Sequence, residues 1–107
     1  YLAKEDPAKA LEKYISRTSH IHFKDVRENI FNKIYLENLS FLKAVKSGVF
    51  TVPGDGILDM KKLAQVVHQS EYEGWIVVEA EQDPYVANPY EYAKKGYEFL
   101  SKDLNFK

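Results

Sequence analysis

The chain has 107 residues, of which 45% are hydrophobic and 29% charged, as expected of one globular domain with a modest core. A formal net charge of -1 gives no electrostatic basis for binding nucleic acid or a membrane surface, and no apolar stretch approaches the roughly 18 residues of a membrane span. Without cysteine there is no disulfide, thiolate metal site or cysteine nucleophile, which fits a cytoplasmic setting.

A helix is predicted from Pro7 to about Ser16. Asp6 can cap its N-terminus, and proline suits the first helical position. Apolar side chains recur at helical spacing along this segment: Ala10, Leu11, Tyr14 and Ile15.

The segment at residues 18–27 has the alternation of a strand. It places three polar side chains on one face and two apolar ones on the other: His20, His22 and Lys24 against Ile21 and Phe23. We expect the polar face to point inward, because a second strand also becomes ionisable at its C-terminal end.

Residues 28–47 have a helical apolar pattern, which we expect Asn38 or Ser40 to divide into two helices. Gly48 is a natural helix stop. Asp59 is expected to cap the next helix, whose buried stripe comprises Leu63, Val66 and Val67.

The second strand, residues 75–81, is apolar until Glu79 and Glu81, which share a face because they lie two residues apart. An ionised carboxylate that follows four apolar residues is costly unless it is paired or bound to a metal, so Glu79 is the strongest functional candidate. Two strands that both look buried and both become ionisable at their C-terminal ends are typical of parallel strands in an α/β fold with a site at that edge. A last helix is predicted from Asn88, with Pro89 at its first position.

Three blocks of sequence, in this order, resemble the xylose-isomerase-like TIM barrels. They are His20-Ile21-His22-Phe23-Lys24-Asp25-Val26-Arg27, Val52-Pro53-Gly54-Asp55-Gly56-Ile57-Leu58-Asp59 and Gly74-Trp75-Ile76-Val77-Val78-Glu79. Within that superfamily the chain is most similar to the inosose dehydratases, lyases of myo-inositol catabolism. The resemblance implies that residues 1–107 form a single partial domain, the C-terminal part of a (β/α)8 barrel, with the two strands as its seventh and eighth.

The resemblance also implies a divalent metal, held by two carboxylates from earlier strands, a histidine on the seventh strand and a glutamate on the eighth. By position, the two ligands in this chain are His22 and Glu79. Mn²⁺ or Co²⁺ is expected, with Mg²⁺ as the alternative, to polarise the ketone of a keto-inositol before water is eliminated. Lys24 and Glu81 are the catalytic candidates. Arg27 is the substrate-binding candidate, although its spacing from His22 differs from that expected of a sugar epimerase.

Each candidate also has a structural interpretation. His22 could be a hydrogen-bonded core histidine, and Glu79 a solvated strand end. Glu81 could be a solvated loop carboxylate, and Lys24 could form an ion pair with Glu79 or Glu81. Of the remaining histidines, we expect a structural role for His20 and a solvated position for His68.

Two other functions remain open. A ketose epimerase or isomerase of the same superfamily would use the same metal chemistry and the same residues. The other is a truncated, non-catalytic chain, because a complete barrel needs about 250 residues and the remaining ligands would lie upstream of Tyr1. We expect such a chain to associate with itself or with the missing part of the barrel through open strand edges. An endonuclease of this superfamily is disfavoured by the near-neutral charge.

Overall fold

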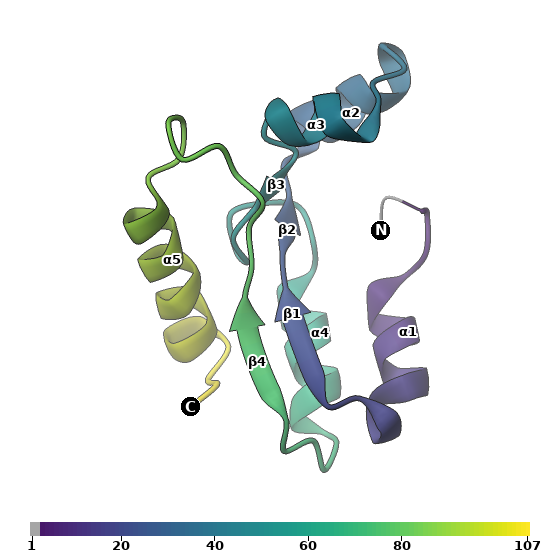
Figure 1. Ribbon diagram of the computed structural model, residues 1–107. Coiled ribbons are helices and arrows are strands. Elements are labelled where there is room, and N and C mark those ends of the chain that lie inside the picture. The colour runs from purple at the N-terminus through teal and green to yellow at the C-terminus, as the bar shows by residue number, and fades with distance from the viewer. Residues whose placement is uncertain (1–2) are drawn as a thin grey trace.

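The computed structural model describes residues 3–107 as two pairs of strands surrounded by helices (Figure 1). The elements in chain order are α1 (Pro7–Tyr14), the 3₁₀ helix η1 (Ile15–Arg17), β1 (His20–Phe23), β2 (Asp25–Val26), α2 (Glu28–Leu36), α3 (Phe41–Lys46), β3 (Phe50–Thr51), α4 (Met60–His68), β4 (Trp75–Val78), α5 (Pro89–Glu98) and the π-helical turn η2 (Phe99–Asp103). None of these helices has both the length and the apolar character needed to cross a membrane.

The central strands β1 and β4 are parallel, as predicted, with His22 opposite Val77 and Phe23 opposite Val78. Helix α4 lies between them in the sequence and packs behind them, beside α1, while α5 flanks β4 on the other side (Figure 1). The main core forms between the strands and these helices, and includes Ala8, Ile21, Phe23, Met60, Leu63, Ala64, Val67, Leu100 and Leu104.

Local sequence signals set the helix boundaries. The Asp6 carboxylate accepts hydrogen bonds from the first turn of α1, at 2.9 Å from the Ala8 amide. The predicted division of residues 28–47 is confirmed. Asn38 adopts a left-handed φ of 53° and Ser40 caps α3, which places the break between α2 and α3. Gly48 follows α3 with a φ of 82°, a conformation that glycine adopts without strain.

The polar face of β1 is exposed, so the expectation that it points inward is wrong for the residues described. Ile21 and Phe23 are buried, whereas His20 and His22 are exposed. The apolar side chains pack into the core beneath α1 and α4, and alternation along the strand then turns the histidines to the opposite face.

The segment predicted as one strand changes partner at Lys24. Before it, β1 pairs with β4; after it, β2 pairs antiparallel with β3, with Asp25 opposite Thr51. The change is stabilised by the Asp25 carboxylate, which is fully buried and accepts four backbone N–H hydrogen bonds of 2.8 to 3.1 Å, from Val26, Gly54, Gly56 and Leu58. Only glycine fits at position 56, because an added Cβ would lie 2.5 Å from Asp25 Oδ1.

A smaller core lies beyond the ends of β1 and β4. It is formed by Val26, Ala44, Val49 and Phe50, with partly buried side chains from α2 and α3 packed against it. This core places the α2–α3 segment at the edge of the sheet where both central strands end (Figure 1).

His68 is exposed, as expected, and it also makes specific contacts. Its Nε2 donates to the Leu104 carbonyl at 2.7 Å, and its ring stacks on Phe106 at 4.6 Å between centroids. His68 therefore helps to hold the C-terminal segment against α4.

Candidate active site

The two central strands bring four of the predicted side chains to one edge of the molecule. His22 lies on β1 and Lys24 directly follows it, while Glu79 and Glu81 follow β4. The Glu79 amide donates to the Phe23 carbonyl at 3.0 Å, which extends the parallel pairing by one step. Because β1 and β4 run parallel, their carboxyl ends meet at this edge.

The four side chains form a continuous polar cluster. His22 Nδ1 lies 2.8 Å from Glu79 Oε2, and Lys24 Nζ lies 2.8 Å from the other Glu79 oxygen, Oε1. The same ammonium group is 2.8 Å from Glu81 Oε2 and 4.5 Å from the centre of the Phe50 ring. The ion pair expected of Lys24 as a structural alternative is therefore present, with both glutamates.

The charges in this cluster stabilise one another. The hydrogen bond from Lys24, and then that from His22, lower the pKa of Glu79. Burial alone would lower the pKa of Lys24, but its hydrogen bonds to Glu79 and Glu81 raise it overall. At neutral pH the cluster therefore contains a cationic lysine and an anionic Glu79. The side chains of His22 and Glu81 remain about half exposed.

Arg27 lies outside this cluster. Its Nη1 donates to the carbonyls of Gly48 at 2.9 Å and Phe50 at 3.1 Å. Its Nη2 is 3.4 Å from Asp55 Oδ2 and 3.3 Å from the Tyr92 hydroxyl. The guanidinium group thus links three segments of the chain, while its part in substrate binding stays a prediction.

Asp55 is the centre of this second group. Its carboxylate accepts a 2.6 Å hydrogen bond from the Thr51 hydroxyl and forms an ion pair with Lys95 on α5. Burial alone would raise the pKa of Asp55, but the bonds from Lys95 and Thr51, with the charges of Lys95 and Arg27, lower it overall. The ionised Asp55 carboxylate therefore links the loop after β3 to helix α5.

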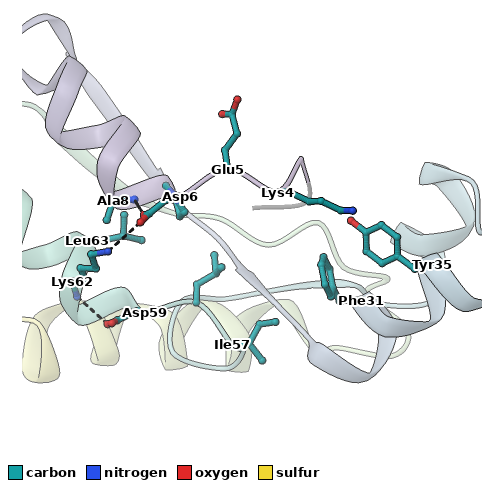
Figure 2. Close-up of a pocket in the computed structure, with 12 residues that line it drawn as sticks. Lys4, Glu5, Asp6, Ala8, Phe31, Tyr35, Ile57, Asp59, Lys62 and Leu63 are labelled. Atoms are coloured by element: carbon teal, nitrogen blue, oxygen red, sulfur yellow. Dashed lines mark hydrogen bonds and ion pairs between the residues drawn. The ribbon is translucent and has the colours of Figure 1, made fainter.

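A large hollow lies elsewhere, between the segment before α1, helix α2 and the start of α4 (Figure 2). It measures about 710 Å³, has apolar side chains such as Phe31, Ile57 and Leu63 in its wall, and carries the Asp6–Lys62 ion pair on its rim. None of the four clustered side chains lines it. We place the candidate active site at the strand ends, because the ionisable groups converge there.

The family model described as the xylose isomerase-like TIM barrel matches residues 1–103. The chain belongs to this family. Among its relatives, the inosose dehydratase of Clostridium botulinum (strain Eklund 17B / Type B) is 48% identical over 98 residues, which are 92% of this chain and 33% of that protein.

Two further inosose dehydratases are similarly close. That of Geobacillus thermodenitrificans (strain NG80-2) is 53% identical over 96 residues, 90% of this chain and 32% of the relative. That of Lacticaseibacillus casei is 49% identical over 104 residues, 97% of this chain and 35% of the relative. The chain thus spans about a third of the length of the curated relatives it matches.

Membership of the xylose isomerase-like TIM barrel family fits the architecture. Strand β1, helix α4 and strand β4 form a parallel βαβ unit, the repeating unit of such barrels. Side chains at the carboxyl ends of barrel strands line the active sites of these enzymes, and the polar cluster lies at that end. The predicted fold class, an α/β part of this barrel type, is confirmed.

The chemistry of His22 and Glu79, an imidazole nitrogen and a carboxylate oxygen, suits the divalent ions that the family resemblance implies. In the structure these two atoms, His22 Nδ1 and Glu79 Oε2, are joined by a hydrogen bond of 2.8 Å. Residues 3–107 contain no group of three or more metal-ligating side chains. The part of the chain that the structure describes therefore holds no complete ligand set, and metal binding by His22 and Glu79 stays a prediction.

Three residues around the site were missed by sequence reasoning: Thr51, Asp55 and Gln82. Thr51 is buried within a two-residue strand, and Gln82 lies in a loop, so neither belongs to a periodic pattern. For Asp55 a signal existed, because an acidic residue between Gly54 and Gly56 indicates a tight turn that presents a carboxylate.

Proposed function

We propose that this chain contributes to an inosose dehydratase, a lyase that eliminates water from 2-keto-myo-inositol. One observation carries the proposal. The 2.8 Å contacts among His22, Glu79, Lys24 and Glu81 gather a candidate metal-ligand pair and two candidate catalytic groups at the carboxyl ends of β1 and β4. The identity of about half to inosose dehydratases, over most of this chain, directs that chemistry to a keto-inositol.

His22 Nδ1 and Glu79 Oε2 would hold a divalent ion, Mn²⁺ or Co²⁺, with Mg²⁺ as the alternative. When bound, the ion would polarise the ketone as a Lewis acid. The Lys24 ammonium group stabilises the negative charge that builds up on oxygen when the neighbouring C–H bond breaks.

Glu81 acts as the acid–base group in this proposal. Its carboxylate, about half exposed and hydrogen-bonded to Lys24, accepts the proton from the carbon beside the ketone. The same proton then passes to the departing hydroxyl as its C–O bond breaks. Water leaves, and the glutamate returns to its starting state.

The first experiment is native mass spectrometry of the chain with Mn²⁺. We expect the 12.4 kDa chain alone to be inactive. A species heavier by one whole subunit, with metal retained, would mean that self-association rebuilds a site, and turnover of keto-inositol by that species is then assayed. A metal-free monomer without turnover would reject activity for this chain alone. Parallel assays with ketoses test the alternative of a ketose epimerase or isomerase.

Variants make the metal test specific. His22→Ala and Glu79→Gln should each abolish metal retention, because each removes one of the two proposed ligands. His20→Ala is the matched control, since His20 lies on the same exposed face but contacts Ser19 rather than Glu79. Equal metal retention by all three variants would refute the proposed ligand pair.

A further inference from the structure

The segment after β4 turns its side chains alternately to two sides. Glu79 and Glu81 contact Lys24 on one side. Ala80 and Gln82 face the other, where they line a small hollow of about 200 Å³ together with Val52 and residues of α5. The direction of the Glu81 side chain therefore depends on the contacts that Gln82 makes on the opposite side of this segment.

Gln82 is held by a buried hydroxyl group. Its Nε2 lies 3.4 Å from Thr51 Oγ1, and Thr51 on β3 is fully buried. The single hydroxyl hydrogen of Thr51 is donated to Asp55 Oδ2 at 2.6 Å. The Thr51 oxygen can therefore only accept a hydrogen bond from Gln82, and the amide nitrogen of Gln82 must be the donor.

The position of the Thr51 hydroxyl is itself fixed by Asp55. Asp55 is an ion-pair partner of both Lys95 and Arg27, so its position is set from α5 and from the segment after β2. The segment after β4 is thus fastened at two points, the Glu79 amide on the Phe23 carbonyl and the Gln82 amide on Thr51. Glu81 lies between them.

We infer that Gln82, held by the Thr51 hydroxyl, is a positioning residue that keeps Glu81 directed at Lys24. The inference rests on the proposed function only for the catalytic role that it gives to Glu81. The side chain of Gln82 is hydrogen-bonded to Thr51 and not to any of the four clustered side chains, so it acts through the backbone that it shares with Glu81.

The unmodified chain provides the first test, by NMR. The side-chain amide of Gln82 should exchange its hydrogens with water more slowly than that of Gln65, an exposed glutamine on α4. Equal exchange rates for the two amides would overturn the inference without any substitution.

The second test measures the nuclear Overhauser effect between the Lys24 and Glu81 side chains. The effect between Lys24 and the Phe50 ring serves as an internal reference, because Lys24 Nζ lies 4.5 Å from that ring. Gln82→Leu should abolish the Lys24–Glu81 effect and keep the reference, while Gln65→Leu should change neither. An unchanged Lys24–Glu81 effect in Gln82→Leu would overturn the inference.

Thr51 provides a rescue experiment. Thr51→Val removes the hydroxyl at similar volume and should have the effect of Gln82→Leu, whereas Thr51→Ser keeps the hydroxyl and should retain the Lys24–Glu81 effect. If Thr51→Val does not fold, the Gln82 measurements decide. All these readouts are independent of turnover. Loss of the Lys24–Glu81 effect in Gln82→Leu, with no keto-inositol activity in the unmodified, metal-loaded assembly, would refute the proposed function and leave the positioning role standing.

Discussion

Single residues at this edge of the molecule are constrained mainly by buried charge. Asp25 is the clearest case, because its carboxylate is inaccessible and yet has no cationic partner within residues 3–107. Four backbone N–H groups take that role, and together they fix the loop from Gly54 to Leu58. This loop carries Asp55, so the buried carboxylate also determines where the second polar group lies.

Asp25→Ala is expected to prevent folding at neutral pH. It leaves four N–H groups without their acceptor, each at a cost of about 1–3 kcal/mol. The four costs together approach the whole free energy of unfolding of a small domain. Urea unfolding followed by circular dichroism measures the effect, and Asp103→Ala, at an exposed acidic residue, is the control. Equal unfolding midpoints for the two variants would show that the buried carboxylate is dispensable.

Asp55 should make stability depend on pH on the acid side. The pKa of the Asp55 carboxyl is lower in the folded state than its ordinary value near 4 in the unfolded chain. Its contribution to the free energy of unfolding is therefore fully present above that ordinary value and is lost as the pH falls through the lower folded pKa. Asp55→Asn should be less stable than the unmodified chain at pH 7, and the difference should shrink as the pH falls below about 4. Urea titrations at several pH values test this, and a difference that stays constant with pH would contradict it.

Individual elements are defined by local signals at their ends and by competition for partners between them. The predicted strand at residues 18–27 is divided at Lys24 because β3 provides an antiparallel partner for β2 that the sequence pattern does not reveal. The division has a consequence for the site. Lys24 lies between the two strand pairs, where its ammonium group reaches both glutamates.

The start of α5 offers a test at this scale. The Asn88 side chain accepts from the amides of Tyr90 at 3.0 Å and Glu91 at 3.3 Å, and Asn88→Ala should reduce the free energy of unfolding by about 1 kcal/mol. Asn88→Asp keeps an acceptor and adds a favourable charge at the helix N-terminus, so it should match or exceed the original stability. Chemical unfolding of both variants checks the prediction, and equal losses would exclude a capping role.

The whole molecule exposes features that a closed barrel would cover. The described strands β1 and β4 pair only with each other, and Trp75 at the start of β4 is 72% exposed. Unpaired strand edges promote association with another chain. We therefore propose that the chain associates with a second copy or with the remainder of a barrel.

Sedimentation velocity over a range of concentrations tests self-association. Trp75→Lys should shift the chain toward the monomer, because a charge on an exposed strand edge opposes pairing. Tyr85→Lys is the matched control, since Tyr85 is a 98% exposed aromatic residue in the loop before α5. A monomer at all concentrations would exclude association with a second copy, and an equal effect of both variants would exclude the β4 edge.

The sequence alone determined the features that depend on neighbours along the chain. Caps at Asp6, Ser40, Asp59 and Asn88, and the glycine stop after α3, are local effects that propensity and spacing predict well. Strand alternation likewise placed Glu79 and Glu81 on one face, and the block resemblance predicted the family. The tertiary structure alone decided that the histidine face is exposed, that Lys24 lies between two carboxylates and that Thr51 holds Gln82. Those outcomes depend on contacts between residues 31 to 57 positions apart, and the packing of helices and the choice of strand partner create such contacts only when the chain folds.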